Sequence, residues 1–334
     1  MNTRLLNGTL VLLLIGAVTL SAFAQGPNWK GTEYPDYMTV YNEKEPGKQA
    51  ILAEKYLADH KDADPEVLTQ IYQFMLFGYA NSGNWLKALE SVERMAVAPK
   101  LTDADRANYT QIGMLAAASA NNTPKTREYA ERILKENPKN FKALVALSGV
   151  LYQNVPTGPE KDAHVARTLQ VTKDALALGR PQEVSEAQFT QIALQLHETM
   201  CLMLLNQQKN MEAIDECQEA LKLNPKDGFA WYWIGLAHRA ALFDLYKKYN
   251  DAVDNYNNNR DKGQLVVDEL TAQMQGADKV ATDKRDETID AFVRAIVIGG
   301  DAGQAAMAEL EKIYTGTRDE LNKIIEDKKR QLGA

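Results

Sequence analysis

A histidine and two cysteines are the residues of this sequence whose types and spacing could best support chemistry. His197 and Cys201 lie four residues apart, so they share one face if the segment is helical, and Cys217 follows further along the chain. Imidazole and thiolate groups are preferred zinc ligands, so the three side chains could hold a metal ion. The alternative is that they are core residues of medium size. We favour the core interpretation and predict no metal and no cofactor.

The two cysteines could instead form a disulfide. If the chain turns near Gln208, two antiparallel helices bring Cys201 and Cys217 opposite each other, and an oxidising compartment would permit the bond. The bond requires close Cα atoms, which sequence does not reveal. A disulfide and a pair of buried free thiols therefore both remain open.

Motifs of common catalytic classes do not occur in this sequence. It contains no G-x-S-x-G, H-E-x-x-H, C-x-x-C or P-loop pattern. The glycines at 299, 300 and 303 follow a segment with helical periodicity and not a strand, so they indicate a helix break. His60, His164 and His238 stand alone. We therefore predict no catalytic residues and no enzyme activity; an enzyme whose site is assembled from several helices is the remaining alternative.

The elements that position these residues are predicted to be helices. Asp64-Pro65 is a favourable helix start, and so are the polar pairs of Thr102-x-x-Asp105, Ser185-x-x-Gln188 and Thr317-x-x-Glu320. Alternating runs of β-branched residues are few, while Ala, Leu, Glu, Lys and Gln dominate. The chain is predicted to be all-α.

One stretch shows how these helices follow one another. From Met211 onward, apolar residues at helical spacing end at Asn224-Pro225, and a second helix is predicted around Trp231 and Gly235. A helix that stops at Asn-Pro and restarts at once is typical of stacked helical hairpins.

The same helix-ending motif occurs earlier in the chain, where 134–138 repeats the Leu-Lys-x-Asn-Pro of 221–225. Together with the Trp-x-x-x-Gly spacing, the pattern resembles the tetratricopeptide repeat, a unit of about 34 residues. The resemblance covers about 45–297, in five hairpins. It implies a right-handed α-solenoid of TPR-like helical hairpins.

The last repeat departs from the family pattern. Apolar residues continue past 241 to Tyr256, a turn cluster occupies 257–263, and helical spacing then leads back to 297. We predict an extended helical hairpin arm at 242–284, about 24 Å long. Residues 298–334 are predicted to form capping helices, because the last of them has the polar surface that the end of a solenoid needs.

The resemblance also implies a groove. In this family the concave face binds a segment of another protein. By that mapping, the partner groove of this chain would carry Lys142, Tyr152, Gln153, Gln195, Glu198, Asn206, Phe229, Tyr232 and Arg239. The set does not reproduce the Lys/Asn/Arg clamp by which some members hold Glu-Glu-Val-Asp tails, so binding of chaperone tails is not implied.

The N-terminus predicts export. Arg4 precedes an apolar run, and Ser21-Ala-Phe-Ala24 fits the cleavage rule, so 1–24 is a predicted signal peptide cleaved after Ala24 and 25–44 a partly extended segment. No cysteine follows, so a lipid anchor is not expected. No later segment is long and apolar enough to insert in a membrane after cleavage. The predicted location is periplasmic or secreted; an uncleaved anchor helix is the alternative.

The formal net charge of −7 disfavours nucleic acid as a partner, because nucleic-acid binding needs a basic face. We therefore predict a non-catalytic protein–protein interaction scaffold in the bacterial cell envelope, with a protein or peptide partner. One alternative is a structural homo-oligomer, such as a homodimer through the arm 242–284. Another is a solenoid that binds small molecules or glycans.

Overall fold

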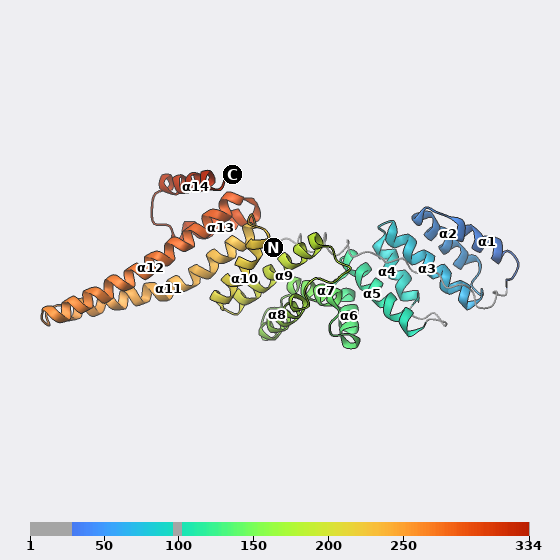
Figure 1. Ribbon diagram of the computed structural model, residues 1–334, viewed down its shortest axis with the longest axis horizontal. Helices are drawn as coiled ribbons and strands as arrows, with labels where there is room; N and C mark the ends of the chain where they lie inside the picture. The colour runs from blue at the N-terminus through green and yellow to red at the C-terminus, as the bar shows by residue number, and fades with distance from the viewer. Residues whose placement is uncertain (1–28, 96–101, 334) are drawn as a thin grey trace. The chain divides into compact units, whose positions relative to one another are not determined.

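The computed structural model describes residues 29–95 and 102–333 (Figure 1). The predicted signal peptide, 1–24, lies outside these residues. Across the described ranges the chain forms fourteen α-helices and no strand, so it is all-α as predicted. It divides into two compact units. Unit 1 comprises the described parts of Met1–Val155 with Gln170–Phe189, and unit 2 those of Pro156–Leu169 with Thr190–Ala334.

Unit 1 is a stack of helical hairpins. Its helices are α1 (Glu33–Asn42), α2 (Pro46–Asp59), α3 (Pro65–Asn81), α4 (Trp85–Met95), α5 (Asp103–Ser119), α6 (Thr123–Glu136) and α7 (Phe141–Gln153), with the second part of α8 (Lys161–Ala177). Each of α1 to α6 packs against the next helix in the chain. Ile71, Leu76, Met95, Leu147 and Leu151 are fully or almost fully buried between them. This order of contacts is that of an α-solenoid.

Helix starts in this unit follow the predicted capping residues. Asp64 accepts a hydrogen bond from the backbone N–H of Glu66 at 2.9 Å, and Pro65 is the first residue of α3. Thr102 and Asp105 form a reciprocal capping box at the start of α5. Both predictions are confirmed.

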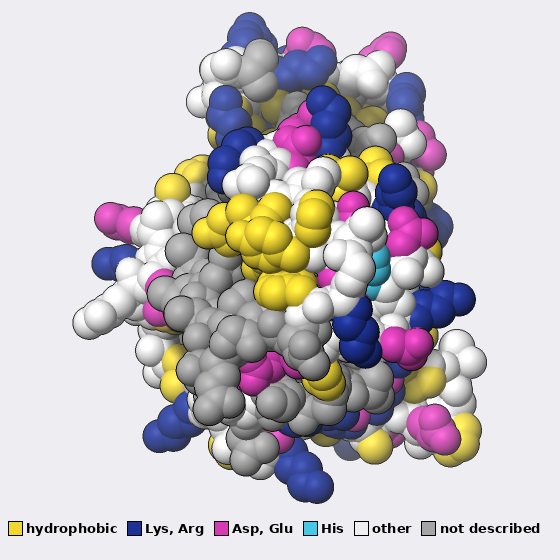
Figure 2. Space-filling view, turned by 90° about the vertical axis from the view of Figure 1, so that its right-hand side faces the viewer, with side chains coloured by type: hydrophobic (Ala, Val, Ile, Leu, Met, Phe, Trp, Pro, Cys, Tyr) yellow, Lys and Arg dark blue, Asp and Glu magenta, His cyan; other side chains and the backbone are white. Residues whose placement is uncertain are grey.

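The segment around α1 differs from the predicted extended structure, because Glu33–Asn42 is helical. Tyr34, Tyr37 and Tyr41 recur at helical spacing, and the ring of Tyr37 lies 5.2 Å from Trp29 and 6.4 Å from Phe74 of α3. These contacts hold α1 against unit 1. Figure 2 shows this end of the unit, where hydrophobic side chains gather; Tyr34 and Tyr41 are its exposed aromatic residues.

Unit 2 contains the longest helices. After the first part of α8 it comprises most of α9 (Glu186–Asn206), then α10 (Asn210–Leu223), α11 (Gly228–Asn259), α12 (Gln264–Ile298), α13 (Gly300–Ile313) and α14 (Arg318–Leu332). Trp233, Ile234 and Ala291 belong to one buried cluster, and Phe292, Leu310 and Leu321 to a second. Gly235 permits the close approach of α11 and α12, since a Cβ there would lie 2.5 Å from the ring of Phe292.

α11 and α12 form one long hairpin, with 32 and 35 residues. Leu242 and Ala281 are buried along it, and Nζ of Lys284 lies 3.2 Å from Nδ1 of His238. Burial, then the charge of Lys284, lowers the pKa of His238. The turn at 260–263 falls within the predicted turn cluster. Among the described residues, no helix has the length and apolarity that crossing a membrane requires.

Candidate partner-binding site

The two cysteines are joined. Cys201 of α9 and Cys217 of α10 form a disulfide with their Cα atoms 5.4 Å apart, and both are fully buried. The antiparallel α9–α10 hairpin places them opposite each other, with Gln208 in its turn. The bonded sulfurs are not thiolates, so the cysteines cannot act as the zinc ligands considered from the sequence.

The neighbours of Cys201 on α9 have separate partners. Nδ1 of His197 lies 2.8 Å from a carboxylate oxygen of Glu216 on α10. Glu198 is only 6% exposed and hydrogen-bonds Asp227, which is also buried. Burial, then the hydrogen bond and charge of Asp227, raises the pKa of Glu198 to about 9. Glu198, which the family mapping places in the partner groove, is therefore a buried carboxyl that is protonated at neutral pH.

The remaining predicted groove residues are distributed over both units. Lys142, Tyr152 and Gln153 lie on α7 of unit 1, and Gln195, Asn206, Phe229, Tyr232 and Arg239 on α9 and α11 of unit 2.

Several of those in unit 2 contact their own fold. The rings of Phe229 and Trp233 lie 5.7 Å apart, Tyr232 packs 6.1 Å from Phe292, and Arg239 forms an ion pair with Glu309 of α13. These contacts fix their side chains.

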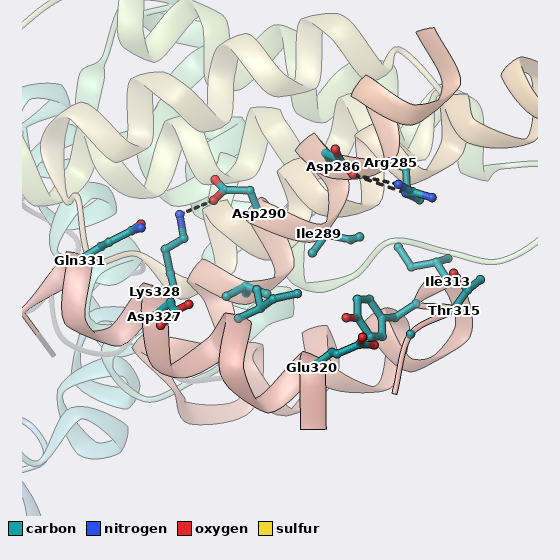
Figure 3. Close-up of a pocket in the computed structure, with 14 residues that line it drawn as sticks. Arg285, Asp286, Ile289, Asp290, Ile313, Thr315, Glu320, Asp327, Lys328 and Gln331 are labelled. Carbon is teal, nitrogen blue, oxygen red and sulfur yellow. Dashed lines mark hydrogen bonds and ion pairs between the residues drawn. The ribbon is translucent and has the colours of Figure 1, made fainter. Parts of the chain in front are cut away.

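A cleft that the sequence did not predict lies between α12 and α14 (Figure 3). Its volume is about 600 Å³. It is lined by Arg285, Asp286, Ile289, Asp290 and Val293 of α12, by Ile313 of α13, by Tyr314, Thr315 and Gly316 of the connecting loop, and by Glu320, Ile324, Asp327, Lys328 and Gln331 of α14. Three consecutive elements thus form one surface.

The floor of the cleft is apolar. Ile289 and Val293 come from one face of α12, Ile313 ends α13, and Ile324 comes from α14. Leu321 and Ile325 of α14 are buried in the second core cluster, against which Ile324 also packs, and they hold this helix in place. The four floor residues are therefore held by packed helices, and a ligand would meet a formed surface.

An ion pair between α14 and α12 fixes one edge of the cleft. Nζ of Lys328 lies 2.5 Å from Asp290, whose other oxygen bonds Arg294 at 2.6 Å. Burial alone would raise the pKa of Asp290, but the hydrogen bonds from Lys328 and Arg294 outweigh it and keep that pKa below its ordinary value. This ion pair ties α14 to α12, as the dashed line in Figure 3 shows.

The opposite edge is fixed by the start of α14. The backbone N–H of Thr317 donates to Glu320 at 2.8 Å, and the N–H of Glu320 donates to the Thr317 hydroxyl at 3.3 Å. This is the predicted capping box, and it is confirmed. The hydrogen bond from Thr317 also lowers the pKa of Glu320, so this carboxylate stays ionised at the mouth of the cleft.

The lining combines apolar side chains with charged ones. It carries four carboxylates (Asp286, Asp290, Glu320, Asp327) against two cations (Arg285, Lys328). An apolar floor beneath an acidic rim can hold a ligand that presents an apolar group beside a positive charge.

Comparisons with known proteins do not assign a family. No protein-family model and no curated protein matches the chain. Among solved structures, it is similar to MamA MSR-1 C2, with 15% identity and a TM-score of 0.39, over 65% of this chain and 98% of that one. It is also similar to the human IFIT1 dimer with m7Gppp-AAAA, with 11% identity and a TM-score of 0.28, over 85% of this chain and 67% of that one. Similarities this low support no argument about function.

Proposed function

We propose that this protein is an exported, non-catalytic scaffold that binds a segment of another polypeptide. The observation that supports this most is the cleft between α12 and α14. It combines an apolar floor with a charged rim. A chain of helical hairpins offers such surfaces without needing chemistry at them.

The partner segment is proposed to be apolar and basic. Ile289 and Ile324 would contact an apolar side chain, and Glu320 and Asp327 would pair with lysine or arginine. Charge pairs at such an exposed rim chiefly set orientation and association rate, while the buried apolar contact supplies affinity.

Export is supported by the disulfide, which is rare in reducing compartments. The predicted signal peptide is consistent with it. We propose the periplasm or the cell exterior as the location, with a partner in the cell envelope. Gln195 and Asn206 of unit 2, which the tetratricopeptide resemblance places in a groove, remain a proposed second contact.

Site-specific photocrosslinking tests this proposal. A photoreactive amino acid at Thr315, exposed in the loop at the cleft, should crosslink a partner polypeptide in cells that export the full chain. Ile289→Glu should abolish the crosslink, because it places a charge on the apolar floor. Ile51→Glu is the matched control, since Ile51 is an exposed isoleucine of unit 1.

The crosslink should persist with Ile51→Glu. Purified Ile289→Glu protein should keep the helix content of the wild type by circular dichroism, which separates lost binding from lost folding. A crosslink that survives Ile289→Glu would place the partner elsewhere and would refute this site.

A further inference from the structure

One face of α12, directed away from α11, is exposed along the arm. We define the outer stripe as Leu265, Glu269, Ala272, Gly276, Lys279 and Asp283, all of which are exposed. Their separations alternate between four and three residues, so they form one line along the helix. Leu270 and Ala281, on the other side of α12, are buried. The stripe is thus an unpartnered helix face among the described residues.

The middle of the outer stripe consists of the smallest side chains. Ala272 and Gly276 are one helical turn apart, and a Cβ built on Gly276 would meet no atom within 4 Å. Glycine in a helix interior is unfavourable and is explained where another backbone must come close. No neighbour within the described part of the chain provides that close contact.

The charges of the arm are arranged symmetrically about the same point. Ala272 and Gly276 are equidistant from Met274, and so are Glu269 and Lys279. Within the described part of the chain, neither Glu269 nor Lys279 takes part in an ion pair. A helix that carries a positive group opposite Glu269 and a negative group opposite Lys279 would therefore satisfy both. An antiparallel copy of the same helix has this pattern.

We propose that the outer stripes of two copies of this chain pair antiparallel, with a twofold axis passing at Met274. In this register Ala272 of each copy lies opposite Gly276 of the other, and Glu269 lies opposite Lys279. The small residues allow the helices to approach closely at the centre. Leu265, which is 86% exposed, then lies one helical turn from Val280 of the other copy, itself 51% exposed.

The ends of the pairing extend the charge match. Lys262 in the arm turn and Asp286 are also equidistant from Met274, so they face each other between copies. A parallel pairing would instead place each Glu269 beside its equivalent and each Lys279 beside its equivalent, which repels. The interface is isologous, so every favourable contact occurs twice and the assembly closes as a dimer.

Charge reversal on the full chain tests the proposal independently of ligand binding in the cleft. By light scattering, the wild type should have the mass of a dimer, while Glu269→Lys and Lys279→Glu should each be monomeric. The double variant, Glu269→Lys with Lys279→Glu, should regain the dimer mass, because the pair is restored with its charges exchanged. Glu212→Lys, an exposed change on α10 away from the arm, should leave the dimer intact.

Disulfide crosslinking tests the register. Both native cysteines are already bonded to each other, so introduced thiols can be followed alone. A mixture of Ala272→Cys and Gly276→Cys chains should crosslink faster than either variant by itself. A wild type that is monomeric throughout would overturn the proposal, as would a dimer mass that neither charge reversal changes.

Discussion

Replacing Glu198 by glutamine should change how the stability of unit 2 depends on pH. Glu198 lies on α9 and is 6% exposed. Its partner Asp227 begins α11, where one carboxylate oxygen accepts the backbone N–H groups of Phe229 at 2.9 Å and Ala230 at 3.2 Å. The other oxygen is buried and, among the described residues, has no recorded hydrogen-bond donor. A protonated Glu198 can donate to it.

The sign and size of the effect follow from the raised pKa. The pKa of Glu198 is about 9 in the folded chain, against an ordinary value of 4.5. Its contribution to stability is complete below the ordinary value and is lost as the pH rises toward 9. Within this window each pH unit costs the folded state about 1.4 kcal/mol. From a pH of about 5 to about 8, the free energy of unfolding of the wild type should therefore fall by about 4 kcal/mol relative to that of Glu198→Gln, because glutamine does not titrate.

Urea unfolding at a series of pH values measures this difference. Trp29 and Trp85 belong to unit 1, so a background with phenylalanine at both positions lets the fluorescence of Trp231 and Trp233 report on unit 2. Glutamine can still donate a hydrogen bond to Asp227, so its fold should be retained.

The control for this experiment is Glu212→Gln, a substitution at an exposed position of α10. Its free energy of unfolding should change with pH in the same way as that of the wild type. If the curves for Glu198→Gln and the wild type also stayed parallel, to within about 1 kcal/mol, the burial and pairing inferred for Glu198 would be refuted.

Three further changes test the packing of unit 2. Cys201→Ser should lower its free energy of unfolding by about 3 kcal/mol, because the disulfide closes a loop across 16 residues; equal urea midpoints would contradict this. Gly235→Ala should cost about 1 to 3 kcal/mol by crowding Phe292, and a second change, Phe292→Leu, should recover part of that loss if crowding is the cause. Thr317→Ala should remove about 1 kcal/mol from the start of α14, seen as faster amide exchange there than in α13.

The sequence predicted those features of the fold that depend only on residues close to one another in the chain. Asp64, Ser185 and Thr317 mark helix starts because their side chains bond backbone groups two or three residues away. The turn of the long hairpin was predicted from the cluster of turn-forming residues at 257–263. The helix at Glu33–Asn42 was missed, because it is held by aromatic contacts with Phe74 of α3, distant in sequence.

The cleft could not be predicted because it depends on how helices cross. Lys328 lies on the same side of α14 as the buried Leu321 and Ile325, and only the packing of α14 against α12 shows that it meets Asp290. The surroundings of Glu198 could not be predicted for a related reason. The family mapping assigns positions on a helix face, whereas the pKa of Glu198 is raised by burial and by Asp227 at the start of a different helix.

Peptide-library selection with the full chain tests the central claim, that the cleft between α12 and α14 binds a polypeptide. The wild type and Ile51→Glu should both enrich sequences with an apolar residue beside lysine or arginine, and Ile289→Glu should enrich none of them. No enrichment by the wild type, or the same peptides retained by Ile289→Glu, would contradict the account.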